Sequence, residues 1–352
     1  MTSFYKDKTV FVTGCTGFKG TWLCKLLLEL KVKLIVGYSL DPPTNPSLFE
    51  FTKLQKEDKF IFIKGDILNY NQLEAAIIAY KPDIVIHLAA QPIVLTGYKE
   101  PRLTYETNVM GTVNILNACR EENVKTILNV TTDKVYENLD LPNPFKENDR
   151  LNGFDPYSNS KSCSELITSC YYKSFLNDRT VITARAGNVI GGGDFSPDRI
   201  VVDSVKSLSK NEPILVRNPY STRPYQLVLD AVYAYLYIIE KTWDTKKLYN
   251  YNVGPDFQSV ITTKELVTMI CDVWSPKNPG WYTTAIKNAP HEAKNLTLDC
   301  GKIKQELGWK PITNISQAID YTVDWYTNYY QNIDITTKQI KQFLGEVEKW
   351  NS

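Results

Sequence analysis

The sequence predicts an α/β fold: a Rossmann-type doubly wound parallel sheet with a smaller, interleaved lobe in the C-terminal part. Three observations lead to this prediction. Short apolar runs alternate with helical stretches through the first half of the chain, as in strand–helix–strand units. A glycine-rich turn joins the first apolar run to the first helical stretch. After about Gly191 the alternation stops, and the turn-rich segment GGGDFSPDR begins a different pattern.

The apolar runs are short and bounded by turn residues, which is typical of strands buried in a parallel sheet. We expect strands at Thr9–Thr13, Leu34–Tyr38, Phe60–Ile63, Ile84–Ala89, Thr126–Val130 and Val181–Ala184. We expect helices at Thr21–Leu30, Tyr70–Tyr80, Val109–Glu122, Tyr157–Phe175, Asp230–Lys241, Lys264–Trp274, Gly301–Leu307, Ile315–Tyr330 and Thr336–Trp350. The stretch Asn211–Tyr225 is expected to be irregular. Residues 1–188 with about 226–254 then form the sheet domain, and about 189–225 with 255–352 form the second lobe.

Length and composition exclude several classes of protein. The 352 residues suffice for two domains, and the net charge of +1 lacks the basic excess of a general nucleic-acid or membrane-surface protein. No apolar stretch is long enough for a transmembrane helix, and the N-terminus does not resemble a signal peptide. The seven cysteines include no CxxC pair and the chain has two histidines, so neither a disulfide framework nor a metal site is expected. These features predict a reduced, cytoplasmic protein.

The glycine-rich turn predicts a dinucleotide site. Gly14, Gly17 and Gly20 form GxxGxxG between the first strand and the first helix. In that context the glycines permit a tight turn, close approach of a pyrophosphate and close packing of the helix, whose N-terminal amides face the phosphates. No arginine stands at Gly37–Asp41 to bind a 2′-phosphate, and Asp41 would repel one, so NAD is favoured over NADP.

Two further strand ends belong to this site. Asp66 follows the third strand and is placed to meet the adenine; it could equally cap the next helix, and the two roles are compatible. Ala89 and Ala90 end the fourth strand with side chains small enough to lie under a cofactor. His87, in the same strand, is expected to be a packed residue that supports the site.

Tyr157 and Lys161 form a YxxxK pair, whose side chains share one face of a helix. A nearby ammonium would favour the phenolate and lower the tyrosine pKa from about 10, so that Tyr157 could take a proton from a sugar or alcohol hydroxyl. Tyr237 and Lys241 have the same spacing, but their helix is apolar and is expected in the core. The Tyr157 pair follows the carboxyl end of a strand, where ligands bind in such sheets.

The chain resembles the extended short-chain dehydrogenase/reductases that act on nucleotide sugars, and most closely their CDP-glucose 4,6-dehydratase branch. The resemblance covers most of the chain. Its motifs are GCTGFKG (14–20), GYSLDPPTNPSLFE (37–50), HLAAQ (87–91), NVMGT (108–112), TTDKVY (131–136), DPYSNSK (155–161), RAGNVIGGGD (185–194), RNPYSTRPYQLVLD (217–230) and PHEAKNLTLD (290–299).

The resemblance implies a reaction in three stages: oxidation at C4 with NAD, loss of water across C5 and C6, and return of hydride to C6. Tyr157 would deprotonate the 4-hydroxyl, and Thr132 would hydrogen-bond the 4-oxygen. Asp133 would protonate the departing 6-hydroxyl. Lys134 stands where many relatives have a glutamate base; it would take the C5 proton, directly or through a water, and would have to be neutral to do so. The alternative for Asp133 and Lys134 is a surface ion pair.

The resemblance also gives the full set of contacts. The expected catalytic residues are Thr132, Asp133, Lys134, Tyr157 and Lys161. The expected NAD contacts are Gly14, Thr16, Gly17, Phe18, Lys19, Gly20, Asp66, Ile67, Leu88, Ala89, Ala90, Thr107, Tyr157 and Lys161. The expected substrate contacts are Gln91, Asn188, Arg199, Arg217, Arg223 and His291, with the arginines suited to a diphosphate. Arg185 is expected to support the strand end, and His291 could instead cap an element.

Some alternatives stay open. Leu95, Thr96 and Leu227 depart from the branch's pattern, so a sugar other than glucose, still carried on CDP, is an alternative substrate. A nucleotide-sugar 4-epimerase shares the glycine turn and the Tyr–Lys pair but needs no acid and base at 133 and 134. A non-catalytic NAD-binding scaffold would need none of these residues. The resemblance further implies a homodimer, in which the helices at Thr107–Glu122 and Tyr157–Phe175 pair with their copies.

Overall fold

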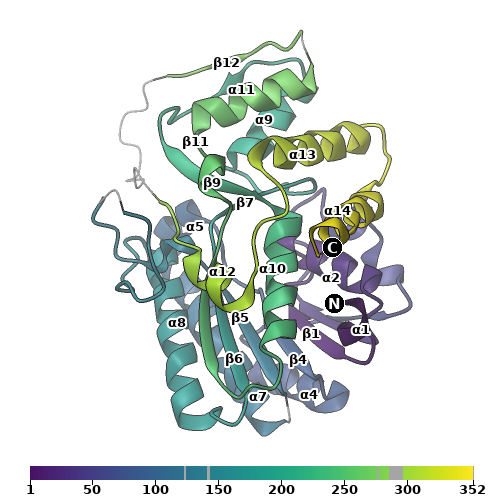
Figure 1. The fold of residues 1–352 in the computed structure, drawn as a ribbon, viewed down its shortest axis with the longest axis vertical. Coiled ribbons are helices and arrows are strands. Elements are labelled where there is room, and N and C mark those ends of the chain that lie inside the picture. The colour runs from purple at the N-terminus through teal and green to yellow at the C-terminus, as the bar shows by residue number, and fades with distance from the viewer. Residues whose placement is uncertain (123, 141–142, 276, 285–295, 352) are drawn as a thin grey trace.

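The centre of the protein is a parallel sheet (Figure 1) in a computed structural model that describes residues 1–122, 124–140, 143–275, 277–284 and 296–351. Within these residues seven strands lie in the order β10–β6–β5–β4–β1–β2–β3, and all neighbours are parallel. Their bounds are β1 Thr9–Thr13, β2 Leu34–Ser39, β3 Phe60–Lys64, β4 Ile84–His87, β5 Thr126–Thr132, β6 Thr180–Ala186 and β10 Leu248–Val253. The strand order reverses between β1 and β4, which is where doubly wound sheets bind ligands. The predicted fold class is confirmed.

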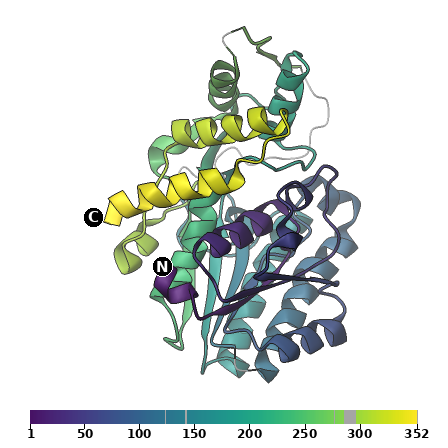
Figure 2. The same ribbon diagram turned by 90° about the vertical axis from the view of Figure 1, so that its right-hand side faces the viewer.

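Helices cover both faces of this sheet (Figure 2). One face carries α2 (Phe18–Glu29) packed against α10 (Val228–Lys241), and the other carries α4 (Tyr70–Tyr80), α7 (Gly111–Glu121) and α8 (Pro156–Phe175) in a row. Short elements join them: α1 Thr2–Tyr5, α3 Leu48–Phe51, η1 Leu54–Lys56, α5 Val94–Lys99, α6 Pro101–Tyr105, the π-helical η2 Glu106–Met110 and η3 Asp133–Val135.

The second lobe lies beyond the carboxyl ends of the strands (Figure 1). A three-stranded sheet, β11–β9–β7, forms its base, and a two-stranded sheet, β12–β8, lies further out. The strands are β7 Asn188–Ile190, β8 Ile214–Leu215, β9 Thr222–Leu227, β11 Val260–Thr262 and β12 Trp281–Tyr282. The helices are α9 Ile200–Ser209, η4 Phe257–Ser259, α11 Thr263–Trp274, α12 Gly301–Leu307, α13 Ile315–Tyr329 and α14 Thr336–Asn351.

Several element boundaries differ from the sequence prediction by one or more residues, and three differences stand out. Strand β4 ends at His87 instead of Ala89, because the amides of Leu88 and Ala89 both donate to the Thr13 hydroxyl at 3.2 Å. Helix α2 begins at Phe18, since Gly17 already serves as its N-cap. The stretch expected to be irregular contains β8 and most of β9, whose partners lie far away in the sequence.

The two lobes share one continuous apolar core. It runs from α2 and the sheet through α10 to Trp325 of α13 and Phe343 of α14. Helix α14 crosses back from the second lobe and packs on α2, so that the two chain termini lie near each other (Figures 1 and 2). The Trp22 indole donates to the Gly192 carbonyl at 2.9 Å and fixes the glycine-rich 191–193 segment between the lobes.

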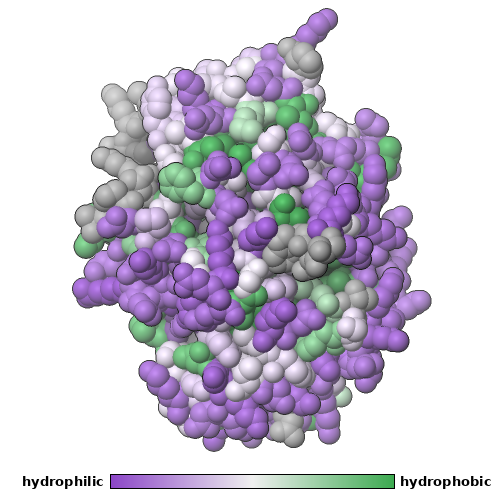
Figure 3. Space-filling view, in the orientation of Figure 1, coloured by the Kyte–Doolittle hydropathy of each residue, from purple (hydrophilic) through white to green (hydrophobic). Residues whose placement is uncertain are grey.

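The molecular surface in the orientation of Figure 1 is mostly hydrophilic, with small, separate hydrophobic patches (Figure 3). Among the described helices, none is both long and apolar enough to cross a membrane. All seven cysteines are free.

Candidate active site

The site forms where the carboxyl ends of β1, β4 and β5 meet the first turns of α2 and α8. The glycine turn after β1 is shaped by two close approaches. Gly14 has φ +73°, and a Cβ there would lie 2.7 Å from the Ala89 nitrogen. A Cβ on Gly20 would lie 2.1 Å from the Gly14 carbonyl oxygen. Both positions therefore require glycine, and the turn lies directly against α2 and the end of β4.

The same turn fits a dinucleotide pyrophosphate. Around Gly17 there is room, since a Cβ there would meet a single neighbouring atom at 3.4 Å. Gly17 is the N-cap of α2, which has no side-chain cap, so the first amides of a twelve-residue helix face this open position. Helix N-termini of this kind bind phosphate through backbone amides and the helix dipole.

The other residues expected at the cofactor line the neighbouring strand ends. The Thr16 hydroxyl bonds the Ser39 hydroxyl at 2.7 Å and donates to the Leu40 carbonyl at 3.1 Å, which ties the turn to β2. Ile67 is buried against Gly111. Phe18 and Lys19 in α2, Leu88 and Ala90 after β4, and Thr107 in η2 are all half-buried.

Two expectations about acidic residues need adjustment. Asp66 accepts from the Leu68 amide at 2.9 Å and so caps a turn; the N-cap of α4 is Asn69. Asp41 is exposed and lies 2.5 Å from Lys64, so its charge at the end of β2 is balanced by a neighbour.

Four of the five expected catalytic residues gather around the end of β5. Asp155 caps α8 and Pro156 occupies its first turn, which brings Tyr157 to the start of the helix. The Thr132 hydroxyl donates to Asp133 Oδ1 at 2.9 Å and lies near enough to Tyr157 to act on the pKa of its hydroxyl. Lys161 donates to the Val130 carbonyl at 3.2 Å, on the same strand. All four side chains are buried.

The electrostatics of Tyr157 differ from the sequence prediction. Burial raises its pKa to about 12, although the Thr132 hydroxyl and the Arg199 charge act in the opposite direction. The predicted lowering of this pKa is therefore wrong for the protein alone, because desolvation of the phenolate outweighs the neighbouring charges. The Lys161 pKa is lowered to about 8 by burial and by the charge of Lys19.

Asp133 has the environment of a proton donor. It is 1% exposed, and burial raises its pKa. Neighbours that partly offset this effect are Lys134, Thr132, Arg223 and Lys19. Its second oxygen, Oδ2, is buried without a hydrogen-bond partner among the described residues. Such a carboxyl holds its proton to higher pH than an exposed one and can give it to a reacting group.

Lys134 follows on the η3 turn, half-buried, and its amide donates to the Thr132 hydroxyl at 3.4 Å. Its charge acts on Asp133. The positive charge of Lys19 helps to lower the Lys161 pKa. The pKa of Lys19 is itself lowered to about 8 by burial and by the charge of Arg199. Basic groups from η3, β9 and α2 thus act on the Asp133 carboxyl.

Some of the expected substrate contacts lie near the catalytic residues, some are bonded to other residues of the protein, and one lies outside the described residues. Arg199 and Arg223 act electrostatically on the catalytic residues, and Asn188 begins β7 beside Tyr225 of β9. Arg217 is paired with Asp198 at 3.0 Å and Asp203 at 3.7 Å.

The Gln91 side chain is engaged within the protein. Its amide nitrogen donates to Thr104 at 2.8 Å, and its oxygen accepts from the Ile93 amide at 2.7 Å. His291 lies outside the described residues.

A buried ion pair beneath the site was not singled out in the sequence. Glu165, one turn beyond Lys161, binds Arg185 through two nitrogens at 3.0 and 2.9 Å, and it also accepts from Thr131 and Thr183. Arg185 therefore supports the strand end, as expected. The signal for Glu165 was its i+4 spacing from Lys161, and its charge opposes the lowering of the Lys161 pKa.

His87 is packed, as expected. It is 1% exposed, and its Nδ1 lies 2.8 Å from the Thr13 hydroxyl. Burial and the Lys161 charge lower its pKa to about 3, so the ring is neutral.

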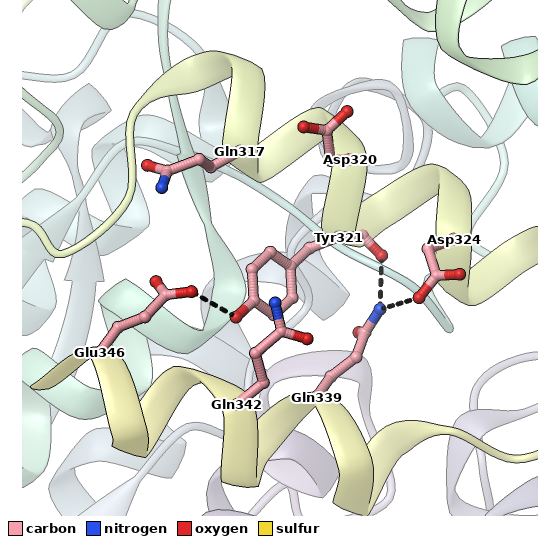
Figure 4. Close-up of a pocket in the computed structure, with 7 residues that line it drawn as sticks. All are labelled: Gln317, Asp320, Tyr321, Asp324, Gln339, Gln342 and Glu346. Atoms are coloured by element: carbon pink, nitrogen blue, oxygen red, sulfur yellow. Dashed lines mark hydrogen bonds between the residues drawn. The ribbon is translucent and has the colours of Figure 1, made fainter.

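A separate groove of about 270 Å³ lies between α13 and α14 (Figure 4). In it Tyr321 donates to Glu346 at 3.2 Å and Gln339 donates to the Tyr321 carbonyl at 2.8 Å. None of the predicted site residues lines this groove, and its polar groups bridge the two helices.

Known proteins share sequence with most of this chain. The family model described as GDP-mannose 4,6 dehydratase matches residues 11–322. The CDP-glucose 4,6-dehydratase of Salmonella typhimurium is 39% identical to this chain, over 97% of the chain and 98% of that protein. The dTDP-glucose 4,6-dehydratase of Haemophilus influenzae is 26% identical, over 90% of this chain and 97% of that protein.

Solved structures agree in fold. The dTDP-glucose 4,6-dehydratase of Bacillus anthracis, in complex with NAD, has a TM-score of 0.78 and 23% identity over 92% of this chain and 98% of that chain. The UDP-glucuronic acid 4-epimerase of Bacillus cereus, in complex with UDP-glucuronic acid and NAD, has a TM-score of 0.80 and 23% identity over 92% of this chain and all of that one.

Proposed function

We propose, from the premise that this chain belongs to the GDP-mannose 4,6-dehydratase family, that it is an NAD-dependent nucleotide-sugar 4,6-dehydratase acting on CDP-glucose. The product would be CDP-4-keto-6-deoxyglucose and water. The observation that carries this proposal is the buried Asp133 carboxyl, hydrogen-bonded to Thr132 beside Tyr157. A 4-epimerase has no leaving group to protonate and no need of such a donor. The identity to the Salmonella enzyme favours CDP as the carrier.

NAD, when bound, would supply the hydride acceptor at C4 and the hydride donor at C6. The open Gly17 position at the head of α2 would hold its pyrophosphate. Thr16, Asp66, Ile67 and Ala89 would line the adenosine and ribose side, while Lys161 would lie at the nicotinamide side next to Tyr157.

Tyr157 would take the proton of the sugar 4-hydroxyl, and the Thr132 hydroxyl would hold the 4-oxygen. Because burial raises the Tyr157 pKa to about 12, the phenolate needs help beyond the protein alone. The ammonium of Lys161 and the positive charge of an oxidised nicotinamide would both stabilise it.

Asp133 and Lys134 would carry out the elimination. Asp133, whose pKa is raised by burial, would protonate the departing 6-oxygen through the free Oδ2. Lys134 would take the C5 proton, which the new ketone at C4 makes acidic, and later return it to C5.

Exchange at C5 tests the assignment of Lys134. In deuterated water the wild-type enzyme should place deuterium at C5, and Lys134→Ala should lose this exchange because no base remains. The matched control is Lys173→Met, an exposed lysine on α8, which should exchange normally. Exchange that survives intact in Lys134→Ala would remove Lys134 from this role.

The substrate's diphosphate would be held by basic side chains of the second lobe. Arg199 and Arg223 are the best placed, since their charges already act on the catalytic residues. Arg217 and Gln91 are engaged within the protein and stay predictions as substrate contacts. We infer that residues 1–188 with about 226–254 bind NAD, and that about 189–225 with 255–352 bind the nucleotide sugar.

We also infer a homodimer through the helices at Thr107–Glu122 and Tyr157–Phe175. Large apolar side chains on this side of the sheet are exposed, including Met110 at 48% and Leu166 at 57%. Pairing with a second copy would bury them. Light scattering on the full chain should give a dimer mass, and Leu166→Glu should shift it toward the monomer. A monomer mass for the wild type would refute the inference.

Incubation with CDP-glucose followed by proton NMR tests the main proposal. A new C6 methyl doublet beside a C4 ketone is the expected product signal. Parallel incubations with dTDP-glucose, UDP-glucose and GDP-mannose establish the carrier and the sugar. A C4-inverted sugar that keeps its 6-hydroxyl would identify an epimerase, and no turnover of any nucleotide sugar would indicate a scaffold.

A further inference from the structure

The proposed dehydration, on which this inference rests, divides its steps between two elements of the site. Tyr157 and Lys161, which would serve the oxidation at C4, lie on the long helix α8. Asp133 and Lys134, which would serve the loss of water, lie on the three-residue turn η3. Because so short a turn has few hydrogen bonds of its own, the positions of this acid and base depend on the contacts that hold the turn from outside.

Tyr136 provides such contacts at the end of η3, where it is the C-cap residue and is 1% exposed. Its hydroxyl donates to Asn252 Oδ1 at 2.6 Å and accepts from Arg185 Nη1 at 2.8 Å. The Arg185 guanidinium also lies 5.1 Å from the centroid of the tyrosine ring. The ring stacks on Phe145, with the centroids 4.9 Å apart and 3° between the planes. The side chain that ends the turn is therefore fixed both along its ring and at its hydroxyl.

The two partners of this hydroxyl are themselves fixed. Arg185 of β6 binds Glu165 of α8 through two nitrogens, at 3.0 and 2.9 Å. Asn252 of β10 is fully buried, and its amide nitrogen donates to the carbonyls of Phe145 and Asp299 at 2.9 and 3.0 Å. The tyrosine hydroxyl thus ties the end of η3 to α8 and β6 through the arginine and to β10 through the asparagine.

The surroundings of the Asp133 carboxyl make a precise position necessary. A Cβ on Gly187, between β6 and β7, would lie 3.2 Å from Asp133 Oδ2 and 3.3 Å from Cγ of Pro224 in β9. One side of the carboxyl therefore lies close against that connection, and a shift of η3 would press Oδ2 onto it or draw Oδ2 away from the substrate. A misplacement of reacting groups by about 1 Å can cost about a hundredfold in rate.

We propose that Tyr136 is a positioning residue for the loss of water. Its hydroxyl holds η3 so that Asp133 meets the departing 6-oxygen and Lys134 meets the C5 proton. Tyr136 takes no part in the chemistry itself and acts only through the turn that it ends.

Oxidation at C4 should not depend on this hydroxyl, because the catalytic residues of α8 are held independently. Asp155 caps the helix, and Lys161 donates to the Val130 carbonyl of β5 at 3.2 Å. Loss of the Tyr136 hydroxyl should therefore separate the two halves of the reaction, with oxidation at C4 retained and the loss of water slowed.

The test measures the two halves separately in the full-length, NAD-loaded enzyme. Enzyme in excess is mixed rapidly with CDP-glucose; the rise in NADH absorbance reports oxidation at C4, and quenched samples report the 4-keto-6-deoxy product. The variants are Tyr136→Phe, which loses only the hydroxyl, and Asn252→Ala, which removes its acceptor and serves if the first variant does not fold. The matched control is Tyr5→Phe, which loses an equally buried hydroxyl that donates to the Leu236 carbonyl at 2.7 Å.

We expect Tyr136→Phe to oxidise C4 within about twofold of the wild-type rate and to form product about ten- to a hundredfold more slowly, so that NADH accumulates. Asn252→Ala should show the same separation. Tyr5→Phe should match the wild type in both rates, although its unfolding temperature should fall about as much as that of Tyr136→Phe. Equal slowing of oxidation and product formation in Tyr136→Phe, or wild-type rates for both, would overturn the positioning role. A wild type that forms no 4-keto-6-deoxy product from CDP-glucose would instead refute the proposed function.

Discussion

Burial of the charged Lys161 side chain lowers the free energy of unfolding, so its replacement by methionine should make the protein more stable. The side chain is 4% exposed, and its pKa is lowered from 10.5 to about 8. Each tenfold change in proton affinity is worth about 1.4 kcal/mol, so holding the charge in the folded protein costs about 3 kcal/mol at neutral pH. Lys161→Met keeps the length of the stem without the charge.

The sign of the pH dependence follows from the two pKa values. Below about pH 8 the lysine is charged in both the folded and the unfolded chain, and the full cost is present. Between about pH 8 and 10.5 the folded chain has released the proton while the unfolded chain still binds it, so the cost declines to zero. The stability gain of Lys161→Met should therefore be largest at pH 7 and nearly absent at pH 10.5.

Urea unfolding followed by circular dichroism at pH 7, 8.5 and 10 measures this difference. Lys173→Met, on the exposed side of the same helix, is the matched control and should show no such trend. Catalytic turnover should be lost in Lys161→Met, which shows that the buried charge is kept for function. A destabilised variant, or a stability difference that does not change with pH, would refute the reasoning.

Three further predictions concern the same site. Asp133→Asn should be more stable than the wild type near neutral pH, because burying the charged Asp133 carboxylate destabilises the folded protein and raises its pKa. This difference in stability should shrink as the pH falls and the wild-type carboxyl becomes protonated, and thermal unfolding from pH 4 to 8 measures it. Gly20→Ala should weaken NAD binding at least tenfold, measured by fluorescence titration, since its Cβ would lie 2.1 Å from a carbonyl oxygen of the turn. Arg185→Met should cost about 3–5 kcal/mol of unfolding free energy by leaving Glu165 buried and unpaired, and adding Glu165→Gln should recover part of it; a double variant as unstable as the sum of both single changes would contradict this.

The fold was predictable because its signals are local. Alternating apolar runs located six of the seven strands of the central sheet, and the glycine turn located the head of α2. The sequence analysis missed all the described strands of the second lobe, which are two to six residues long and pair with segments more than 30 residues away in sequence: β7, β8, β9, β11 and β12. Their pairing is decided by tertiary context, which periodicity does not report.

The site was predictable in its members and less so in its energetics. The YxxxK spacing and the Thr132–Lys134 turn identified groups that do lie together. The expected lowering of the Tyr157 pKa failed, because the extent of burial is a property of the assembled site and outweighs nearby charges. The Glu165–Arg185 pair depends on contacts between α8 and β6, and only its helical spacing from Lys161 was visible in the sequence.

The interleaving of the lobes has a consequence for synthesis on the ribosome. Strand β10 completes the edge of the central sheet, yet it is made after β7, α9 and β9 of the second lobe. Helix α14 is made after every other described element, and it packs on α2, one of the first. Neither lobe can therefore be completed before α14 has been synthesised, and until then the apolar surface that α14 covers on α2 stays exposed. We therefore expect the two lobes to acquire their final structure together, in one cooperative step, once α14 is available.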